Sequence, residues 1–305
     1  NSPKVFIIVL HWNDWSDTSR CLESIQRSTF QNARQVVLYD DSVKDSQRKD
    51  MVFCPEILFI KTKDNLGYAA GNNVGIRHAL ENGADYVWLV NNDTVVDGKC
   101  LDYMVKAAEA DDLIGMVGSK IYYFDKPDTI WYSGGLVDLE QGGLTTHVGK
   151  DMKDDGSYDQ SGATEYVTGC SVLVKRKMIE EIGLLNENYF LYFEDVDWSL
   201  RARNKGWKLF CEPRAKVWHK EGSKEENIYL PHFIYYSLRN RLYLMKRFAP
   251  NSMLKCHLLQ LRMTVFFAKS AIGQGLSACL RAIRLAAYSY IDFYVLKKMG
   301  KSEKI

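Results

Sequence analysis

Apolar residues in the first third of the chain gather into four short runs separated by polar stretches. The runs are VFIIVL (Val5–Leu10), QVVLYDD (Gln35–Asp41), EILFIKT (Glu56–Thr62) and DYVWLVNND (Asp85–Asp93). They are almost continuously apolar and rich in β-branched residues, which is typical of strands covered on both faces of a parallel sheet. Helical patterns lie between them, and strands alternating with helices predict an α/β domain with a mostly parallel sheet.

Two of these helical stretches carry end signals. SDTSRCLESIQRST offers Ser16 or Asp17 as its N-cap. GNNVGIRHALENG closes on Gly83, a residue suited to the left-handed conformation that ends many helices.

Beyond about residue 125 the pattern loosens into Gly-, Asp- and Ser-rich sequence that predicts hairpins and a loop. A strand in EYVTGCSVLVKR, a helix ending at Gly183, a second helix closing at Gly206 and the strand-like WKLFCEP and AKVWHKEG follow. From Tyr229 onward the chain is helical, with Pro250 as a break. We therefore expect a domain over residues 1–228 and a helical C-terminal region over residues 229–305.

Charge is divided unevenly between these two parts. Of the 40 Lys+Arg and 38 Asp+Glu in the 305 residues, only 13 and 2 respectively fall in residues 229–305. A basic tail on an acidic domain predicts contact with an anionic surface. No aromatic-basic recognition motif accompanies the tail, so nucleic acid is not an expected partner.

The first helical stretch of the tail carries apolar positions at helical spacing, flanked by basic residues: Tyr235, Leu238, Leu242 and Met245, with Arg239, Arg241, Lys246 and Arg247. One interpretation is an ordinary helix packed on the domain. Another is an amphipathic helix lying on an anionic bilayer, and a homodimer contact is a third.

Cysteine usage bears on the compartment. The seven cysteines are scattered, odd in number and form no CxxC pair, which argues against a disulfide framework or a zinc site and favours a reducing, cytoplasmic setting. No uncharged apolar run reaches the length of a membrane span, and the start of the chain reads as a strand rather than a signal peptide. We expect a cytoplasmic protein at the inner face of the membrane.

Three polar clusters follow predicted strands, where ligands bind in open parallel sheets. They are Asp40-Asp41-Ser42, Asp64-Asn65-Leu66-Gly67 and Asn91-Asn92-Asp93. Asx residues at strand ends also make ordinary turns. The glycines after the second cluster lack GxGxxG spacing and the Lys of a P-loop, which disfavours a dinucleotide fold. The third cluster places a carboxylate where it could hold a divalent cation on a diphosphate.

The segment FLYFEDVDW (Phe190–Trp198) places three carboxylates in an apolar run. They could favour the dipole at a helix N-terminus, or one of them could be a catalytic base whose pKa the surroundings tune. His219, in VWHKEG, is a structural histidine or a ligand for a Mn²⁺-type ion.

Together these motifs resemble the family-2 inverting glycosyltransferases of the GT-A fold, and within them the bacterial rhamnosyltransferase-like branch. The resemblance runs from about Val5 to Gly222, with a weaker match in YYSLRNRLYLMKRFAP. It is carried by six motifs in order: LYDDSVKDS, DNLGYAAGNNVGIRHAL, WLVNNDTVVDG, VTGCSVLVKR, LLNENYFLYFEDVDWSLRARNKGW and VWHKEGS. It implies an α/β fold with a Rossmann-like mixed sheet and a C-terminal helical appendage.

The resemblance also implies roles for individual residues. The position of the family's acid near the donor nucleoside falls on Asp40, or on Asp41, which replaces a frequent Asn. The nucleotide-contacting residues fall on Asn65, Gly71, Asn72 and Asn92. Asp93, at the end of an NND version of the DxD motif, and His219 would bind Mn²⁺ or Mg²⁺. Asp195 matches the catalytic base, Asp197 the capping residue, and the acceptor-facing positions are Gly169, Glu194 and Trp198.

The implied activity is transfer of a sugar, with inversion, from a nucleotide-sugar donor to a glycan or lipid-linked acceptor. The branch suggests a rhamnose-like sugar from a dTDP- or UDP-sugar, used in bacterial surface polysaccharide synthesis. A galactofuranosyl- or other hexosyltransferase, a non-catalytic nucleotide-sugar-binding module and a nucleotidyltransferase are the alternatives. Release of nucleoside diphosphate would indicate sugar transfer, whereas release of pyrophosphate would indicate a nucleotidyltransferase.

Overall fold

The computed structural model describes residues 2–12, 14–39, 57–220 and 231–295, which belong to two compact units. The first unit takes in residues 1–136, 146–185 and 198–221, and the second takes in residues 137–145, 186–197 and 222–305. The domain boundary expected at residue 228 lies outside the described residues.

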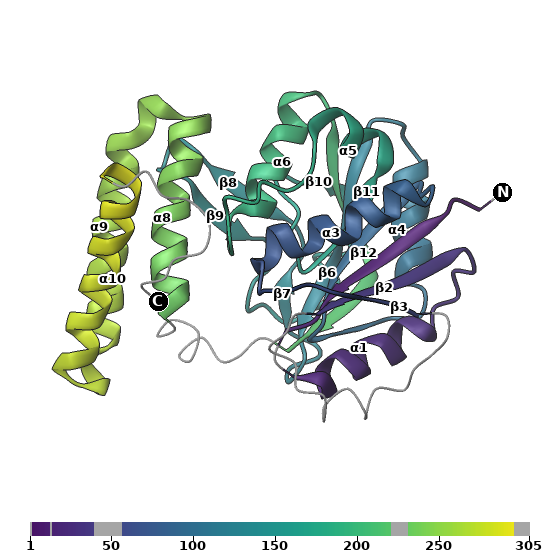
Figure 1. Cartoon of the computed structure of the whole chain (residues 1–305), viewed down its shortest axis with the longest axis horizontal. Helices are drawn as coiled ribbons and strands as arrows, with labels where there is room; N and C mark the ends of the chain where they lie inside the picture. Colours follow the sequence, from purple (N-terminus) through teal and green to yellow (C-terminus); the bar gives the residue numbers. More distant parts are fainter. Residues whose placement is uncertain (1, 13, 40–56, 221–230, 296–305) are drawn as a thin grey trace. The chain divides into compact units, whose positions relative to one another are not determined.

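The described part of the first unit is built on a mixed sheet with the strand order β10-β12-β6-β11-β4-β1-β2-β3, to which β5 and β7 add at β12 and β6 (Figure 1). A two-stranded sheet of β8 and β9 accompanies it. The strands are β1 Val5–Leu10, β2 Ala33–Tyr39, β3 Ile57–Lys61, β4 Tyr86–Asn91, β5 Thr94–Val96, β6 Ile114–Tyr123, β7 Ile130–Tyr132, β8 Gly135–Asp138, β9 Leu144–His147, β10 Gly162–Ala163, β11 Ser171–Lys175 and β12 Lys208–His219.

The four strands predicted from the N-terminal apolar runs are confirmed, and β1 to β4 are mutually parallel. Strand β11 runs antiparallel to both β4 and β6, which makes the sheet mixed. Strand β12 is parallel to β6. The expected WKLFCEP and AKVWHKEG strands are one strand with a register shift between Glu212 and Lys216.

Helices cover both faces of this sheet. The helices with residues in the first unit are α1 Trp15–Gln26, α3 Gly67–Glu81, α4 Cys100–Glu109, α5 Arg176–Ile182 and α6 Glu194–Asn204, the last of which begins in the second unit. Alternate strand residues such as Ile8 and Leu38 pack with α3, α5 and α6 in one buried cluster. Because strand side chains alternate between faces, Tyr39 and Tyr86 point the other way, where they meet Trp15 of α1 and Glu109 of α4.

Glycines bring α3 close to the sheet. A Cβ at Gly71 would lie 2.8 Å from Leu10 Cδ1, and one at Gly75 would lie 2.6 Å from Ile8 Cγ2. The two glycines are four residues apart and so share one helix face. They are packing residues of the helix and strand, and the expected contact of Gly71 with a nucleotide stays a prediction.

The helix ends agree with the sequence signals except at α1. Gly83, Gly183 and Gly206 all have positive φ at the ends of α3, α5 and α6, as expected. The N-cap of α1 is Asp14, whose Oδ1 accepts a hydrogen bond from the Ser16 backbone N–H at 2.8 Å, so neither Ser16 nor Asp17 is the cap.

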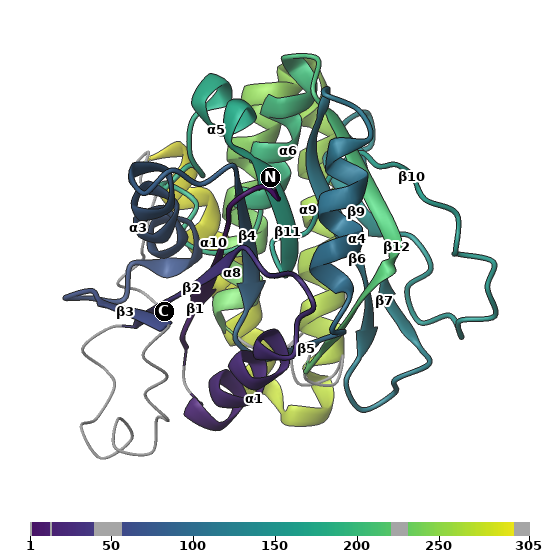
Figure 2. The ribbon, with the colours of Figure 1, turned by 90° about the vertical axis from the view of Figure 1, so that its right-hand side faces the viewer.

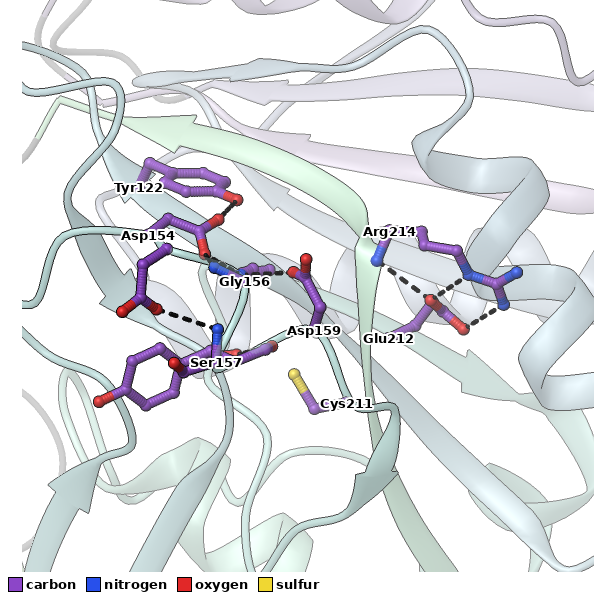
Figure 3. A network of polar contacts seen from close by, with 12 residues as sticks. Tyr122, Asp154, Gly156, Ser157, Asp159, Cys211, Glu212 and Arg214 are labelled. Carbon is purple, nitrogen blue, oxygen red and sulfur yellow. Dashed lines mark hydrogen bonds and ion pairs between the residues drawn. The ribbon is translucent and has the colours of Figure 1, made fainter.

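The loop between β9 and β10 is tied to the sheet by a buried lysine. Lys120 of β6 has no exposed side-chain surface, and its Nζ lies 2.8 Å from both Asp154 Oδ1 and Asp159 Oδ1. The Tyr122 hydroxyl donates to the other oxygen of Asp154, as Figure 3 shows. Burial raises the pKa of Asp154, but the Lys120 and Tyr122 hydrogen bonds outweigh it, so the net pKa is lowered. The ion pairs of Lys120 with Asp154 and Asp159 therefore hold this part of the loop against the sheet.

The second unit is a set of helices, seen side by side in Figure 1: α8 Pro231–Phe248, α9 Met253–Ser270 and α10 Leu276–Tyr294. Helices α8 and α9 are joined by a 3-10 turn at Pro250–Ser252, so the predicted break at Pro250 is confirmed. None of the helices in the described part of the chain is long and apolar enough to cross a membrane.

Helix α8 is the central one. Tyr235, Leu238, Leu242 and Met245 have no exposed surface, and Arg239 and Arg241 are buried as well. The interpretation of this stretch as an amphipathic helix with its apolar side on a bilayer is therefore wrong, because those four apolar residues face protein. Among its basic residues Arg239 and Arg241 are buried, whereas Lys246 and Arg247 are exposed. It is a packed helix.

Candidate functional site

The direction of the strands collects several polar residues at one edge of the first unit's sheet. Strands β1, β4, β6 and β12 run the same way, because β11 is antiparallel to both β4 and β6. The residues after β1 and β4 and at the end of β12 therefore share an edge, as does the segment just before β11. This edge holds Trp12, Asp93, His219 and Cys170, and it is where open sheets bind ligands.

Strand pairing places Asp93 beside His219. Asp93 lies in the turn between β4 and β5, and β5 pairs with the last residues of β12 so that Thr94 lies opposite His219. The backbone N–H of Lys220 donates to the Asp93 carbonyl at 2.9 Å. As a result, Asp93 Oδ1 lies 3.2 Å from His219 Nε2, and the His219 side chain is only 10% exposed.

The electrostatics of the pair favour charge on both groups. Burial raises the pKa of Asp93, but the His219 charge and Lys220 lower it, with a net lowering. Burial lowers the pKa of His219, but Cys170 and Asp93 raise it well above its usual range. Asp93 Oδ1 and His219 Nδ1 are both buried and lack a hydrogen-bond partner among the described residues.

These two side chains fit a divalent cation. A carboxylate oxygen and an imidazole nitrogen suit a Mn²⁺-type ion, and Mg²⁺ commonly uses one or two protein ligands plus substrate phosphate oxygens. Adjacent ligands of an octahedral ion with bonds of about 2.1 Å are about 3 Å apart, close to the 3.2 Å between Oδ1 and Nε2. Within the described residues, no group of three or more His, Cys, Asp or Glu side chains is arranged to hold a metal ion.

Three neighbours of this pair were missed at the sequence level. Trp131 of β7 meets the His219 ring edge-on at 5.0 Å, and its buried Nε1 lacks a hydrogen-bond partner within the described chain. Trp12, directly after β1, is 52% exposed. Lys220 pairs with Asp17 at 2.9 Å beside Asp93. A tryptophan two residues after the predicted strand Val5–Leu10 is the one signal that the sequence offered.

Several expected nucleotide contacts have structural partners instead. Asn72 is 1% exposed and donates to the Tyr68 carbonyl, and its contact with a nucleotide stays a prediction. Asn92, 8% exposed, donates to the Trp12 carbonyl and to Thr18 Oγ1, both at 3.0 Å, and so holds the end of β1. Asn65 is half-buried and accepts from the Gly67 N–H. Asp40 and Asp41 lie outside the described residues.

The two expected acceptor residues of the first unit, Gly169 and Trp198, are both buried. Gly169 is buried, and a Cβ there would lie 2.6 Å from the Tyr68 hydroxyl, which donates to the Gly169 carbonyl. Trp198 is 1% exposed in the main core cluster and donates from Nε1 to the Gly183 carbonyl at 2.9 Å. Trp198 therefore has a packing role in the core, and its contact with an acceptor stays a prediction.

The acidic segment before and within α6 belongs, up to Asp197, to the second unit. Tyr192 and Phe193 have φ of 68° and 72°, in the left-handed region that non-glycine residues rarely adopt. Asn240 of α8 stabilises this bend by donating from Nδ2 to the carbonyls of Leu191 and Tyr192 at 2.8 and 2.9 Å. Arg239 in turn donates to Asn240 Oδ1. Strained backbone of this kind often marks a functional segment.

The three acids have different surroundings. Glu194 is 5% exposed, its Oε2 lacks a partner in the described chain, and burial followed by the neighbouring Asp195 raises its pKa well above the usual range. Asp197 is fully buried and pairs with Arg247 at 3.0 Å. Asp195 is half-buried at the start of α6, where its Oδ1 accepts from the Val196 N–H. Asp195 is the most accessible of the three.

The mixed sheet and the strand-end carboxylate fit a glycosyltransferase of the GT-A fold, and the comparisons with known proteins show the family. The model of the family "Glycosyl transferase family 2" matches residues 6–183. This is more than half of the chain, and the chain belongs to that family. It is therefore an enzyme that transfers a sugar from a nucleotide-sugar donor to an acceptor.

Individual relatives are distant. The dTDP-rhamnosyl transferase RfbF of Shigella flexneri is 21% identical over 223 residues, which cover 70% of this chain and 71% of RfbF. Among solved structures, GalNAc-T7 with UDP, GalNAc and Mn²⁺ matches with a TM-score of 0.64 and 12% identity over 97% of this chain and 57% of GalNAc-T7. The mannosyltransferase PcManGT from Pyrobaculum calidifontis, in complex with GDP-Man and Mn²⁺, matches with a TM-score of 0.60 and 16% identity over 97% of this chain and 82% of PcManGT. These likenesses support the fold.

Proposed function

We propose that the protein is an inverting, metal-dependent glycosyltransferase that moves a rhamnose-like sugar from a dTDP- or UDP-sugar to a glycan or lipid-linked glycan in surface polysaccharide synthesis. The observation that carries the metal-dependent part is the Asp93–His219 pair, whose buried Oδ1 and Nδ1 lack hydrogen-bond partners in the described chain. The sugar rests on the similarity to RfbF at 21% identity. Other hexoses remain the alternative, because the two solved relatives are named with GalNAc and GDP-Man.

In this proposal Asp93 and His219 bind a divalent cation together with the donor diphosphate. When bound, the cation supplies positive charge beside the leaving group. Trp12, exposed after β1, offers a ring on which the nucleoside base can stack. Asn92 supports this surface from behind through its hydrogen bond to the Trp12 carbonyl, and Asn65 shapes the turn before α3.

Asp195 is the proposed base. It takes the proton of an acceptor hydroxyl, whose oxygen forms a bond to the anomeric carbon as the bond from that carbon to the diphosphate oxygen breaks. Nucleoside diphosphate leaves, and the configuration inverts. Glu194 is less suited to this role because it is buried, and burial followed by the neighbouring Asp195 raises the pKa of its carboxyl well above the usual range. Its proposed role is a contact with the acceptor.

A panel of nucleotide sugars tests the donor. We expect dTDP-rhamnose or a UDP-sugar, with Mn²⁺, to raise the unfolding temperature of the full chain most, since a ligand that binds only the native state stabilises it. Incubation with that donor and acceptor should release nucleoside diphosphate and invert the anomeric centre in the product. Stabilisation by GDP-mannose alone would replace the rhamnose assignment, and release of pyrophosphate would contradict the reaction.

Asn240→Ala is expected to lower kcat by about tenfold or more and to leave donor affinity unchanged. The change removes both hydrogen bonds to the Leu191 and Tyr192 carbonyls, at about 1 kcal/mol of stability each, and frees the bend that leads to Asp195. Steady-state kinetics with donor titration measure the split between kcat and KM. Asn251→Ala, an exposed position of the same unit, is the control. An unchanged kcat would show that Asn240 does not position the acidic segment.

A further inference from the structure

The outer sides of α9 and α10 carry an exposed apolar surface. On α9 the residues recur at i, i+4, i+7 and i+11, and α10 begins in the same way. We call this set the apolar face: Leu254, Leu258, Leu261, Val265 and Phe266 of α9, Ile272 of the turn, and Leu276, Leu280 and Ile283 of α10. Leu254 is 72% exposed and Leu276 is 76% exposed. Surfaces of this kind mark a site of interaction.

The apolar face is separate from the packing of these helices within their unit. The opposite side of α10, including Ala282 and Leu285, packs with α8 and with Phe267 of α9 in a buried cluster. The helices therefore already have a core, and the apolar face is additional to it. The exposed leucines cannot be explained as part of that core.

The charges beside this face are of one sign. Lys255, Arg262 and Lys269 recur every seven residues along α9, which places them in one row next to the apolar stripe. Arg281 and Arg284 are likewise exposed on α10. The only acid in residues 253–294 is Asp292, which is fully buried and accepts a hydrogen bond from the Tyr235 hydroxyl. Glu140, from outside these helices, lies 3.8 Å from Lys255.

This pattern distinguishes between possible occupants. A second copy of the chain would bring the same basic rows against one another, and like charges across an interface oppose binding. An anionic bilayer offers the complementary charge at its surface and an apolar interior for the leucines. We propose that the apolar face of α9 and α10 lies in the surface of an anionic membrane, with the basic row among the lipid headgroups.

This proposal does not depend on the identity of the donor sugar. The basic tail predicted a membrane contact at α8, whose apolar residues are buried. The proposal places that contact at α9 and α10 instead. A helix pair lying in the plane of the membrane would hold the enzyme where lipid-linked acceptors are found.

Vesicle flotation of the full chain tests the proposal. We expect the protein to float with vesicles that contain phosphatidylglycerol and to remain in solution with vesicles of phosphatidylcholine alone. Leu258→Gln with Leu280→Gln should lower partitioning by about tenfold or more, because two half-exposed leucines lose their transfer free energy. Arg262→Gln with Arg284→Gln should lower it by about fivefold for each arginine removed, and only on anionic vesicles.

Leu113→Gln, at a 51% exposed leucine of the first unit, is the matched control and should float like the wild type. All substituted positions are exposed, so each variant should retain the wild-type unfolding temperature. Equal flotation with and without phosphatidylglycerol, or wild-type flotation of the leucine variant, would overturn the proposal. So would an absence of flotation combined with a dimer in sedimentation that the leucine variant dissociates, since the face would then join two copies.

Discussion

Replacing Asp195 with asparagine is expected to lower turnover by about a hundredfold to ten-thousandfold, the range typical of a lost general base. The amide keeps the size of the side chain but cannot take the acceptor proton. Because the donor does not need this proton transfer in order to bind, donor affinity should change little. Initial rates of nucleoside diphosphate release, with donor affinity from calorimetry, give the two quantities separately.

The control for this change lies in the same segment. Glu187→Gln removes an exposed acid upstream of Asp195 and should retain wild-type turnover. Glu194→Gln keeps the size of a buried side chain that is not the proposed base, and burial raises the pKa of the Glu194 carboxyl well above its usual range. The rate of this variant should therefore fall much less than that of Asp195→Asn. If Glu194→Gln loses activity and Asp195→Asn does not, the base assignment moves to Glu194.

Asp93→Ala is expected to weaken Mn²⁺-dependent donor binding by about tenfold to a hundredfold. It removes one of the two protein ligands proposed for the ion and leaves His219 without the carboxylate at 3.2 Å. Calorimetry of the free nucleoside diphosphate, with Mn²⁺ and with a chelator, measures the effect. With chelator the wild type and the variant should bind equally, because the difference between them lies in the metal.

Two further variants narrow the interpretation. Asp93→Asn keeps an oxygen at the site without its charge and should give an intermediate affinity. Asp125→Ala, an exposed acid at the end of β6, should bind like the wild type. A donor affinity of Asp93→Ala that depends on Mn²⁺ as strongly as that of the wild type would exclude Asp93 as a metal ligand.

Much of the first unit follows from local pattern. The four apolar runs become β1 to β4, and Gly83, Gly183 and Gly206 end their helices, because strand formation and helix termination depend on neighbouring residues. The strand-end position of Asp93 follows in the same way. The residues that carried the family resemblance also gave the correct fold class.

The identity of each contact did not follow from local pattern. Gly71, Asn72 and Trp198 lie in segments that match the family, yet they are buried against Leu10, Tyr68 and Gly183. A motif marks a segment that carries function, but about half of the side chains in a helix or strand face the core and hold the segment in place. Which side chains of the segment face the core depends on the helices and strands that pack against that segment.

The pairing of Asp93 with His219 shows the same division for residues far apart in the chain. Each residue can be proposed as a metal ligand from its own motif, but the distance between Asp93 and His219 depends on the pairing of β5 with the end of β12. Likewise, the bend at Tyr192 and Phe193 depends on Asn240 of α8. Long-range pairing and hydrogen bonding of this kind leave no periodic signal in sequence.

The C-terminal helices show most clearly the difference between what a sequence pattern predicts and what tertiary packing decides. Sequence alone was sufficient to locate one helix, α8, with apolar residues at helical spacing and basic residues beside it, because amphipathic periodicity is a local property. It could not tell a stripe that faces another helix from one that faces outward. In the folded chain the stripe of α8 has no exposed surface, whereas that of α9 is largely exposed. The difference arises from which helix occupies the centre of the unit, and that is set by the packing of all three helices together.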